Sequence, residues 1–159
     1  MAHDEMPITR AGKDKIEEEL NHLIKVEREK LKETIAEARE LGDLKENAEY
    51  HAAKERQGII EGRIAQLQGI LARARVVDVS KIKSEKIVFG ATVTLRDIEK
   101  ESVVTYQVVG EDEADIRIGK VSFNSPLGRA LIGKEAGDTV IVKAPKGDVE
   151  YEIDEFEFV

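Results

Sequence analysis

The feature that most constrains the fold is a heptad pattern in the first half of the chain. Over residues 48–75, mostly apolar side chains recur at alternating steps of three and four: Tyr50, Ala53, Gln57, Ile60, Ile64, Leu67, Leu71 and Ala74. Residues 13–41 carry a less regular stripe, interrupted at Glu27 and Arg28: Ile16, Leu20, Leu23, Ile24, Leu31, Ile35 and Ala38. Such stripes are typical of helices that pack along their length. We therefore expect two long helices.

The two stripes match each other in antiparallel order. Three pairs of stripe positions have residue numbers that add to the same total: 24 with 64, 35 with 53, and 38 with 50. The centre of this symmetry is residue 44, which places a turn within residues 42–46. At 1.5 Å per residue, each arm of the hairpin would be roughly 42 Å long. A single continuous helix in a parallel homodimer is the alternative, but Gly42 followed by acidic residues favours a turn.

The second half of the chain has a different pattern, with short β-rich segments between turn residues. We expect strands at residues 76–79, 87–89, 92–95, 103–109, 139–142 and 151–158. A short helix is expected at 126–132, capped by Asn124 or Ser125, and Thr9 is expected to cap the first long helix. The sequence thus predicts an α+β fold. A coiled-coil hairpin would occupy residues 1–76, and a β-rich domain residues 77–159.

Composition excludes several classes of function. The 159-residue chain has a formal net charge of −8, which argues against a protein that coats nucleic acid and favours protein partners. It contains no cysteine, so thiol catalysis and thiolate metal sites are excluded and any metal must be bound by oxygen. No nucleophile lies beside a recognisable base. No membrane span or secretory signal is indicated, so we expect a cytoplasmic protein.

The predicted turn, Gly42-Asp-Leu-Lys-Glu-Asn-Ala-Glu-Tyr50, is rich in carboxylates. Asp43 and Glu46 have the spacing of a capping box, which would simply start the second helix. Alternatively, the two carboxylates supply oxygen ligands to a hard cation such as Mg²⁺, in a site that another molecule completes. The residues alone leave both interpretations open.

Two further groups of charges have more than one interpretation. Arg39, Lys45, Lys54 and Arg56 flank the tip, where they form either a solvated face or a short strip that steers a nucleic-acid strand. Asp112-Glu-Ala-Asp115 imitates a helicase motif without the partners that such a motif needs. We interpret it as a solvated acidic loop.

Residues 42–54 resemble the signature of the bacterial Gre-type transcript cleavage factors. Other segments resemble the same family in the same order: Ile8–Gly12, Glu61–Ile64, Phe89–Val93, Val109–Asp115 and Asn124–Lys134. The resemblance covers essentially the whole chain, and the tip and the block at 124–134 are its most specific parts.

The resemblance implies a coiled-coil hairpin followed by a domain similar to FK506-binding proteins. It also implies a factor that is not itself an enzyme. Such a factor binds bacterial RNA polymerase at the rim of the secondary channel and inserts its hairpin. It then stimulates endonucleolytic cleavage of the backtracked nascent RNA at its 3′ end, so that arrested complexes resume elongation. We expect a monomer that binds no membrane.

The resemblance further implies roles for particular residues. Asp43 and Glu46 would be the catalytic tip acids, sharing Mg²⁺ with the polymerase only in the complex, while the chain alone binds no cofactor tightly. The remaining implied roles are RNA positioning by Arg39, Lys45 and Lys54, tip shaping by Tyr50, and polymerase docking by Ser125, Pro126, Leu127 and Arg129.

Three competing functions follow from the same features. A prolyl isomerase needs an aromatic-lined site, and the aromatic residues of the second half fall largely in predicted strands. A structural scaffold would need no particular tip residues. A related inhibitory protein would block the polymerase channel without stimulating cleavage, but Asp43 and Glu46 favour the cleaving kind.

Overall fold

The computed structural model describes residues 5–42 and 47–159, and the chain divides into two compact units. Lys13–Arg73 form the first, which we call the hairpin unit. The described residues up to Gly12 join Ala74–Val159 in the second, which we call the globular unit. The predicted combination of an N-terminal helical hairpin with a β-sheet domain is confirmed. The chain returns to the globular unit at Ala74, whereas the sequence predicted the boundary between residues 76 and 77.

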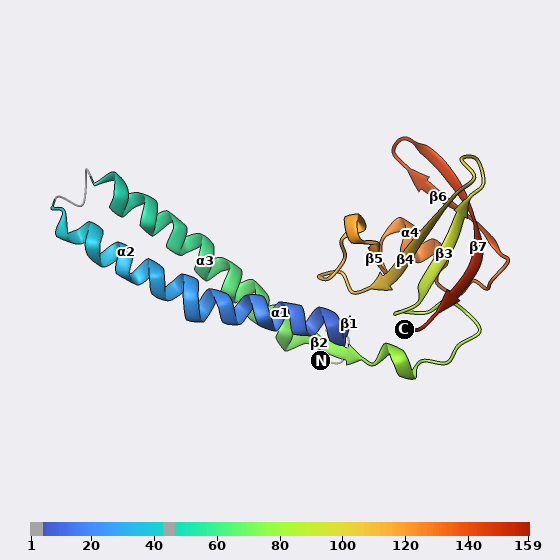
Figure 1. The fold of residues 1–159 in the computed structure, drawn as a ribbon, viewed down its shortest axis with the longest axis horizontal. Coiled ribbons are helices and arrows are strands. Elements are labelled where there is room, and N and C mark those ends of the chain that lie inside the picture. Colours follow the sequence, from blue (N-terminus) through green and yellow to red (C-terminus); the bar gives the residue numbers. More distant parts are fainter. Residues whose placement is uncertain (1–4, 43–46) are drawn as a thin grey trace. The chain divides into compact units, whose positions relative to one another are not determined.

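Two long arms form the hairpin (Figure 1). One arm consists of α1 (Arg10–His22), the π-helical segment η2 (Leu23–Glu27) and α2 (Arg28–Glu40), and the other is α3 (Ala48–Arg73). Contacts between the arms pair residue 19 with 63, 28 with 61 and 38 with 47. Because rising numbers in one arm meet falling numbers in the other, the arms are antiparallel, as predicted.

The π-helical segment explains the interruption of the first stripe. A π turn contains one residue more than an α turn, so it shifts the phase of the helix that follows. After η2, Leu31, Ile35 and Ala38 lie on the buried face of α2. His22 and Glu27 span the segment, with Nε2 of the histidine 3.2 Å from Oε1 of the glutamate.

An apolar seam joins the arms. Leu31 and Ile35 are buried in one cluster with Ala53, Ile60 and Ile64, and four half-buried side chains pack around it: Leu20, Leu23, Ile24 and Tyr50. The predicted seam position Leu71 is only half-buried, and Ile70 is buried instead. A straight α-helix has 3.6 residues per turn, so its buried face drifts away from a strict heptad, which explains the difference near the base of the hairpin.

Two bidentate ion pairs cross the hairpin. Arg28 donates to Glu61 at 2.9 and 2.7 Å, and Arg63 donates to Glu19 at 2.6 and 2.8 Å. These hydrogen bonds lower the pKa of both carboxyl groups. Exposed pairs add little to stability in water. We therefore attribute to them the alignment of the arms, while the seam supplies the stability.

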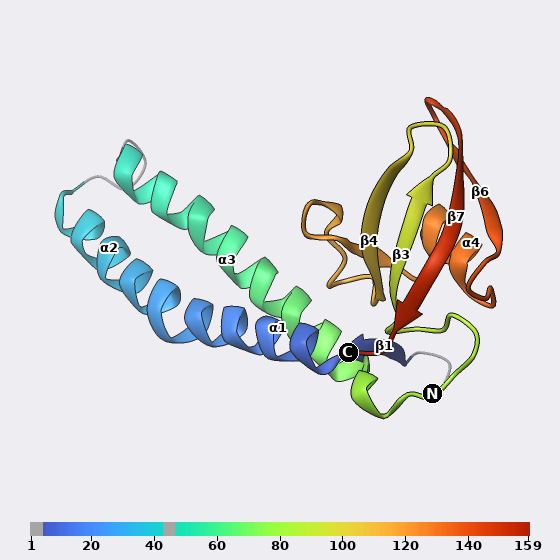
Figure 2. The same ribbon diagram turned by 45° about the vertical axis from the view of Figure 1, so that its right-hand side comes forward.

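The globular unit contains two sheets (Figure 2). A small one pairs β1 (Met6–Thr9) in parallel with β2 (Ala74–Val77). The larger, five-stranded sheet has the order β5 (Lys120–Ser122), β4 (Ser102–Val109), β3 (Thr92–Asp97), β7 (Gly147–Glu157) and β6 (Thr139–Ala144). Its neighbouring strands are antiparallel except for β4 and β5.

The core of the globular unit lies between the larger sheet and α4 (Pro126–Leu131). Val93, Leu95 and Ile153 from the strands are fully buried with Leu131 from the helix. The helix begins where it was predicted, with Ser125 as its N-cap. Two short 3₁₀ segments complete the unit, η3 (Val79–Lys81) and η4 (Ile116–Ile118).

The strand predictions are partly wrong. Residues 87–89 form no strand, although Ile87 is fully buried. Its N–H donates to the carbonyl of Lys134 and its carbonyl accepts from Gly133, so this apolar segment pairs with the turn after α4. β1 and β5 were not predicted, because β5 has only three residues and the four residues of β1 pair with a strand on the other side of the hairpin sequence. None of the helices in the described part of the chain is long and apolar enough to cross a bilayer.

We predict that Ile64→Ala destabilises the hairpin and that Ile59→Ala does not. Ile64 is 3% exposed in the seam, and Ile59, on the same helix, is 66% exposed. Truncating a buried isoleucine typically costs about 2–5 kcal/mol, whereas an exposed one changes stability by less than about 0.5 kcal/mol. Denaturant unfolding of the full chain, followed by helical circular dichroism, measures both. Equal effects of the two substitutions would contradict the seam.

Candidate functional site

The predicted tip acids Asp43 and Glu46, and the neighbouring Lys45, lie outside the described residues. Their roles stay predictions. The described residues on either side define the ends of the two arms, because α2 ends at Glu40 and α3 begins at Ala48. Among residues 5–42 and 47–159, no cluster of three or more histidine and acidic side chains is arranged to hold a metal ion.

Asn47 begins the second arm. Its Oδ1 accepts a hydrogen bond from the N–H of Tyr50 at 3.0 Å, which is the arrangement of a helix N-cap. Its Nδ2 donates to the carbonyl of Ala38 at 2.6 Å and so links the two arms beside the turn. Among the described residues, Asn47 is thus the N-cap of α3, which begins at Ala48. The capping-box interpretation of Asp43 and Glu46 concerns side chains outside the described residues and stays a prediction.

The arms also meet through Arg39 and Tyr50. The guanidinium of Arg39 lies over the ring of Tyr50, 5.9 Å from its centroid, at a distance where a cation is attracted to an aromatic face. Tyr50 is half-buried against the apolar seam. The structure thus brings together one predicted RNA-positioning residue and the predicted tip-shaping residue, one from each arm.

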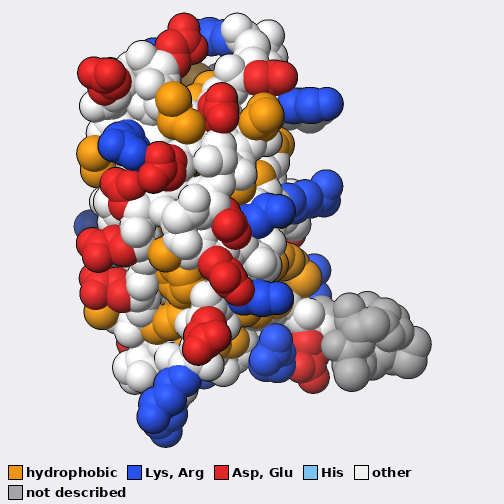
Figure 3. Space-filling view, turned by 90° about the vertical axis from the view of Figure 1, so that its right-hand side faces the viewer, with side chains coloured by type: hydrophobic (Ala, Val, Ile, Leu, Met, Phe, Trp, Pro, Cys, Tyr) orange, Lys and Arg blue, Asp and Glu red, His pale blue; other side chains and the backbone are white. Residues whose placement is uncertain are grey.

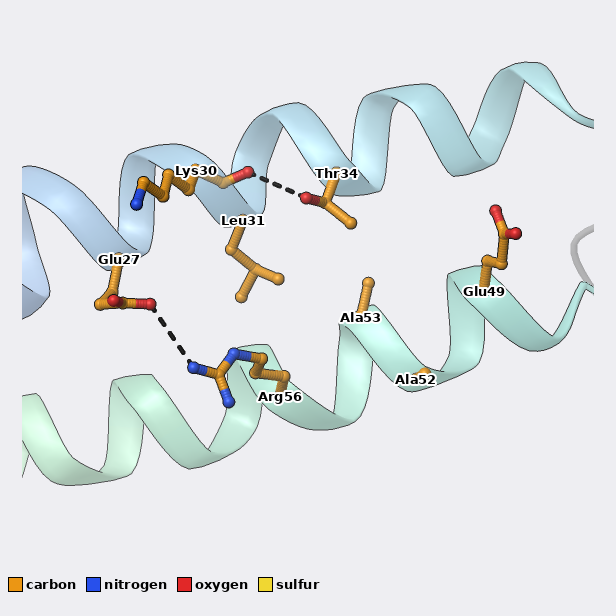
Figure 4. Close-up of a pocket in the computed structure, with 8 residues that line it drawn as sticks. All are labelled: Glu27, Lys30, Leu31, Thr34, Glu49, Ala52, Ala53 and Arg56. Atoms are coloured by element: carbon orange, nitrogen blue, oxygen red, sulfur yellow. Dashed lines mark hydrogen bonds and ion pairs between the residues drawn. The ribbon is translucent and has the colours of Figure 1, made fainter.

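The other described basic residues near the tip have partners on the hairpin itself. Lys54 Nζ donates to Gln57 Oε1 at 2.8 Å, and Arg56 Nη2 lies 3.5 Å from Glu27 Oε2 on the opposite arm. The Glu27–Arg56 pair borders an open groove of about 500 Å³, where Leu31 and Thr34 point toward the small Ala53 (Figure 4). Arg56 therefore contributes to joining the arms.

The predicted docking residues surround the start of α4. Ser125 accepts from the N–H of Gly128 at 3.1 Å, and its hydroxyl donates to the carbonyl of Ser122 at 2.7 Å. A Cβ on Gly128 would lie 2.0 Å from that same carbonyl oxygen, so only glycine allows the helix to pack this closely against β5. Ser125 and Gly128 of the Asn124–Lys134 block thus have structural roles at the start of α4.

Ser125, Pro126 and Leu127 line a largely apolar groove of about 400 Å³, which we call the α4 groove. It also includes Ile116 of η4, apolar residues of β5 and β6, and the turn after β6: Val121, Val142, Ala144 and Pro145. Lys120 and Lys143 contribute positive charge and Asp115 negative charge. Arg129 is exposed on α4 but does not line the groove.

Exposed apolar side chains occur both in the α4 groove and outside it on the globular unit. Figure 3 shows one of its faces, where hydrophobic side chains lie among acidic and basic ones. On η4, Ile116 is 60% exposed and Ile118 is 56% exposed. Of these two, only Ile116 lines the α4 groove. No sequence pattern indicated Ile116, because a single isoleucine after an acidic run has no periodicity.

The prediction of a solvated acidic loop at Asp112–Asp115 is wrong for Glu113. Asp115 caps η4 by accepting from the N–H of Arg117 at 3.1 Å. Glu113 is half-buried and accepts hydrogen bonds from Thr9 and Gly110. Spacing alone could not reveal this, because the partner Thr9 is 104 residues away. Asp112 is exposed, as predicted.

The chain matches two family models that together span most of its length. Residues 6–76 match the model described as transcription elongation factor, N-terminal. Residues 82–158 match the model described as transcription elongation factor, GreA/GreB, C-term.

Two relatives that are similar over nearly their whole length are named transcription elongation factor GreA. The chain is 57% identical to transcription elongation factor GreA of Trichlorobacter lovleyi, covering 96% of this chain and 97% of the relative. It is 56% identical to the GreA of Pseudomonas aeruginosa, covering 92% and 94% respectively.

Among solved structures, GreA factor homolog 1 of Thermus thermophilus matches at 29% identity with a TM-score of 0.41, covering 96% of this chain and 99% of that one. A GreA/GreB factor of Nitrosomonas europaea matches at 21% identity with a TM-score of 0.43, covering 97% and 98%.

We predict that Asn47→Ala destabilises the hairpin by about 1–2 kcal/mol, the usual cost of losing an N-cap. Asn47→Asp keeps the oxygen that accepts from Tyr50 and loses the donor to Ala38, so it should retain the helix cap and lose only the link between the arms. Denaturant unfolding of both variants separates the two contributions. If Asn47→Ala unfolds at the wild-type denaturant concentration, the cap is not a stabilising feature.

Proposed function

Because the chain belongs to the GreA/GreB family of transcription elongation factors, we propose that it binds bacterial RNA polymerase through the secondary channel and stimulates cleavage of the backtracked nascent RNA. The polymerase supplies the catalytic site, and the chain is a stimulating factor without enzymatic activity of its own. It acts as a monomer in the bacterial cytoplasm, where the polymerase works.

One structural observation carries the proposal. Asn47 caps α3 and ties it to Ala38, so starting the second helix and closing the end of the hairpin require neither Asp43 nor Glu46. Asp43 and Glu46 are thus left for another role, and two acids in the turn between arms roughly 42 Å long are suited to a site in another molecule.

The chemistry of the two side chains fits that role. Asp43 and Glu46 supply carboxylate oxygens, the ligand type that Mg²⁺ prefers, and two such groups hold the ion only weakly until the polymerase contributes further ligands. An ion held there would supply a water molecule of lowered pKa as the nucleophile for phosphodiester cleavage. The two carboxylates would orient that water by accepting its hydrogen bonds. Arg39, Lys45 and Lys54 supply positive charge for the RNA phosphates.

The α4 groove is the surface that we assign to the rim of the secondary channel. Its apolar floor matches the compositional pattern of interface centres, and its charged border matches an interface rim. Ser125, Pro126 and Leu127 line the groove, and Arg129 lies exposed on the same helix. Docking and cleavage are thus assigned to separate parts of the chain.

We predict that Asp43→Asn and Glu46→Gln each lower the stimulated cleavage rate about a hundredfold, the size of effect seen when one group that stabilises a transition state is removed. Both changes remove a charge and keep the shape of the side chain. Purified stalled elongation complexes with end-labelled RNA measure the rate, and displacement of labelled wild-type factor measures binding.

Glu49→Gln is the matched control, because Glu49 is an exposed acid in the first turn of α3. It should cleave at the wild-type rate. The tip mechanism is wrong if all three variants stimulate cleavage equally, which is also what a scaffold would do. An inhibitory protein would instead block elongation without producing cleaved RNA.

We further predict that Ile116→Ser weakens docking and that Ile118→Ser does not. Both residues are exposed on the same 3₁₀ segment, but only Ile116 lines the α4 groove. Burying an isoleucine is worth about 1.5–3 kcal/mol, so its loss should raise the half-saturating factor concentration about tenfold or more. The maximal cleavage rate should stay unchanged. Equal half-saturating concentrations for both variants would contradict the assignment of the groove.

A further inference from the structure

Glu113 joins the loop after β4 to the beginning of α1. Its Oε2 accepts from the N–H of Thr9 at 2.9 Å and from the N–H of Gly110 at 3.0 Å, while its Oε1 accepts from the hydroxyl of Thr9. The Thr9 oxygen accepts in turn from the N–H of Gly12 at 3.1 Å, so Thr9 caps α1 as predicted. We call this set of hydrogen bonds the Glu113 cluster.

Two glycines allow the backbone segments of the cluster to approach each other. A Cβ on Gly110 would lie 2.5 Å from the carbonyl oxygen of Pro7 in β1, and a Cβ on Gly12 would lie 2.2 Å from Glu113 Oε1. Both distances are shorter than real carbon contacts. The absence of these two side chains is therefore a requirement of the cluster.

Charge and burial strengthen the cluster. Thr9 is 4% exposed, so its polar groups have little access to water and depend on protein partners. Hydrogen bonds to a carboxylate are shorter and stronger than neutral ones, and a negative charge at a helix N-terminus is favourable. Glu111 and Asp112 of the same loop are exposed, which makes Glu113 distinct among neighbouring acids.

The segment that Glu113 holds continues directly into the hairpin. α1 begins at Arg10 inside the globular unit and runs without a break to His22 in the hairpin unit. The chain returns from α3 into β2, and β2 pairs with β1, the strand that ends at Thr9. Both connections between the units therefore start from one small sheet, and Glu113 fixes one of them to the loop after β4.

We propose that Glu113 is a positioning residue for transcript cleavage. By holding the first turn of α1, it restrains the direction in which the hairpin leaves the globular unit, so that a chain docked through the α4 groove presents its tip reproducibly. This inference rests on the proposed function. A rotation of about 5° at the base would move the end of a 42 Å arm by about 4 Å. A misplacement of about 1 Å can lower a reaction rate about a hundredfold.

The restraint itself is measured without polymerase. Because the chain has no cysteine, spin labels can be attached at two introduced ones, Glu33→Cys on α2 and Lys146→Cys in the turn between β6 and β7, both exposed. The distribution of distances between the labels should broaden in Glu113→Ala and stay unchanged in the control Asp112→Ala. Exchange of the Thr9 and Gly110 amide protons should accelerate in Glu113→Ala only. Unchanged distance distributions would overturn the proposal.

The consequence for cleavage is measured on stalled elongation complexes. Glu113→Ala should lower the maximal cleavage rate about tenfold, while its half-saturating concentration stays within about twofold of wild type. Glu113→Gln, which keeps one accepting oxygen, should restore part of the rate. Gly12→Ala keeps Glu113 but displaces its carboxylate, so it should resemble Glu113→Ala.

A loss that falls entirely on the half-saturating concentration would overturn the positioning role, because it would place Glu113 in docking. A wild-type maximal rate in Glu113→Ala would overturn it as well. If the wild-type factor itself fails to stimulate cleavage, the proposed function has failed, and the spin-label distances still decide whether Glu113 restrains α1.

Discussion

The apolar seam between the arms is the interaction on which the hairpin depends. The first arm is helical from Arg10 to Glu40, with a π-helical segment in its middle, and most helical stability in proteins comes from packing of an apolar face rather than from helix propensity. Packing of Leu31 and Ile35 against Ala53, Ile60 and Ile64 stabilises both arms together. The ion pairs and the Asn47 link then set which residues face each other. Neither would hold the arms together without the seam.

The seam also determines which residues near the tip are available to a partner. Tyr50 packs against the seam and Arg39 lies over its ring, so these two side chains join the arms beside the turn. Asn47 satisfies an N–H of the first turn of α3. Structural needs beside the turn are therefore met by an amide, an aromatic ring and a guanidinium, and the proposed function of Asp43 and Glu46 does not compete with them.

How much the sequence predicts depends on how local each interaction is. The hairpin and α4 follow from periodicity and capping, which act over a few residues, and both are confirmed. The pairing of β1 with β2 was missed because Ile8 meets Val76 across the whole length of the hairpin sequence, and no local pattern records such a pair. The same reason explains Glu113, whose acidic neighbours are exposed. Asn47 was visible in the sequence, but Asp43 and Glu46 offered a competing capping pattern.

A factor that acts in the active site of another protein has a geometric requirement that an enzyme with its own active site does not have. Tethering alone raises the local concentration of the tip acids, but it does not orient them, and orientation is the larger contribution to rate. The proposed function therefore requires a stiff path from the proposed docking surface to the tip. The seam provides stiffness along the arms. At the base, α1 passes between the units as one unbroken helix, and its first turn is held by Thr9, Gly12 and Glu113.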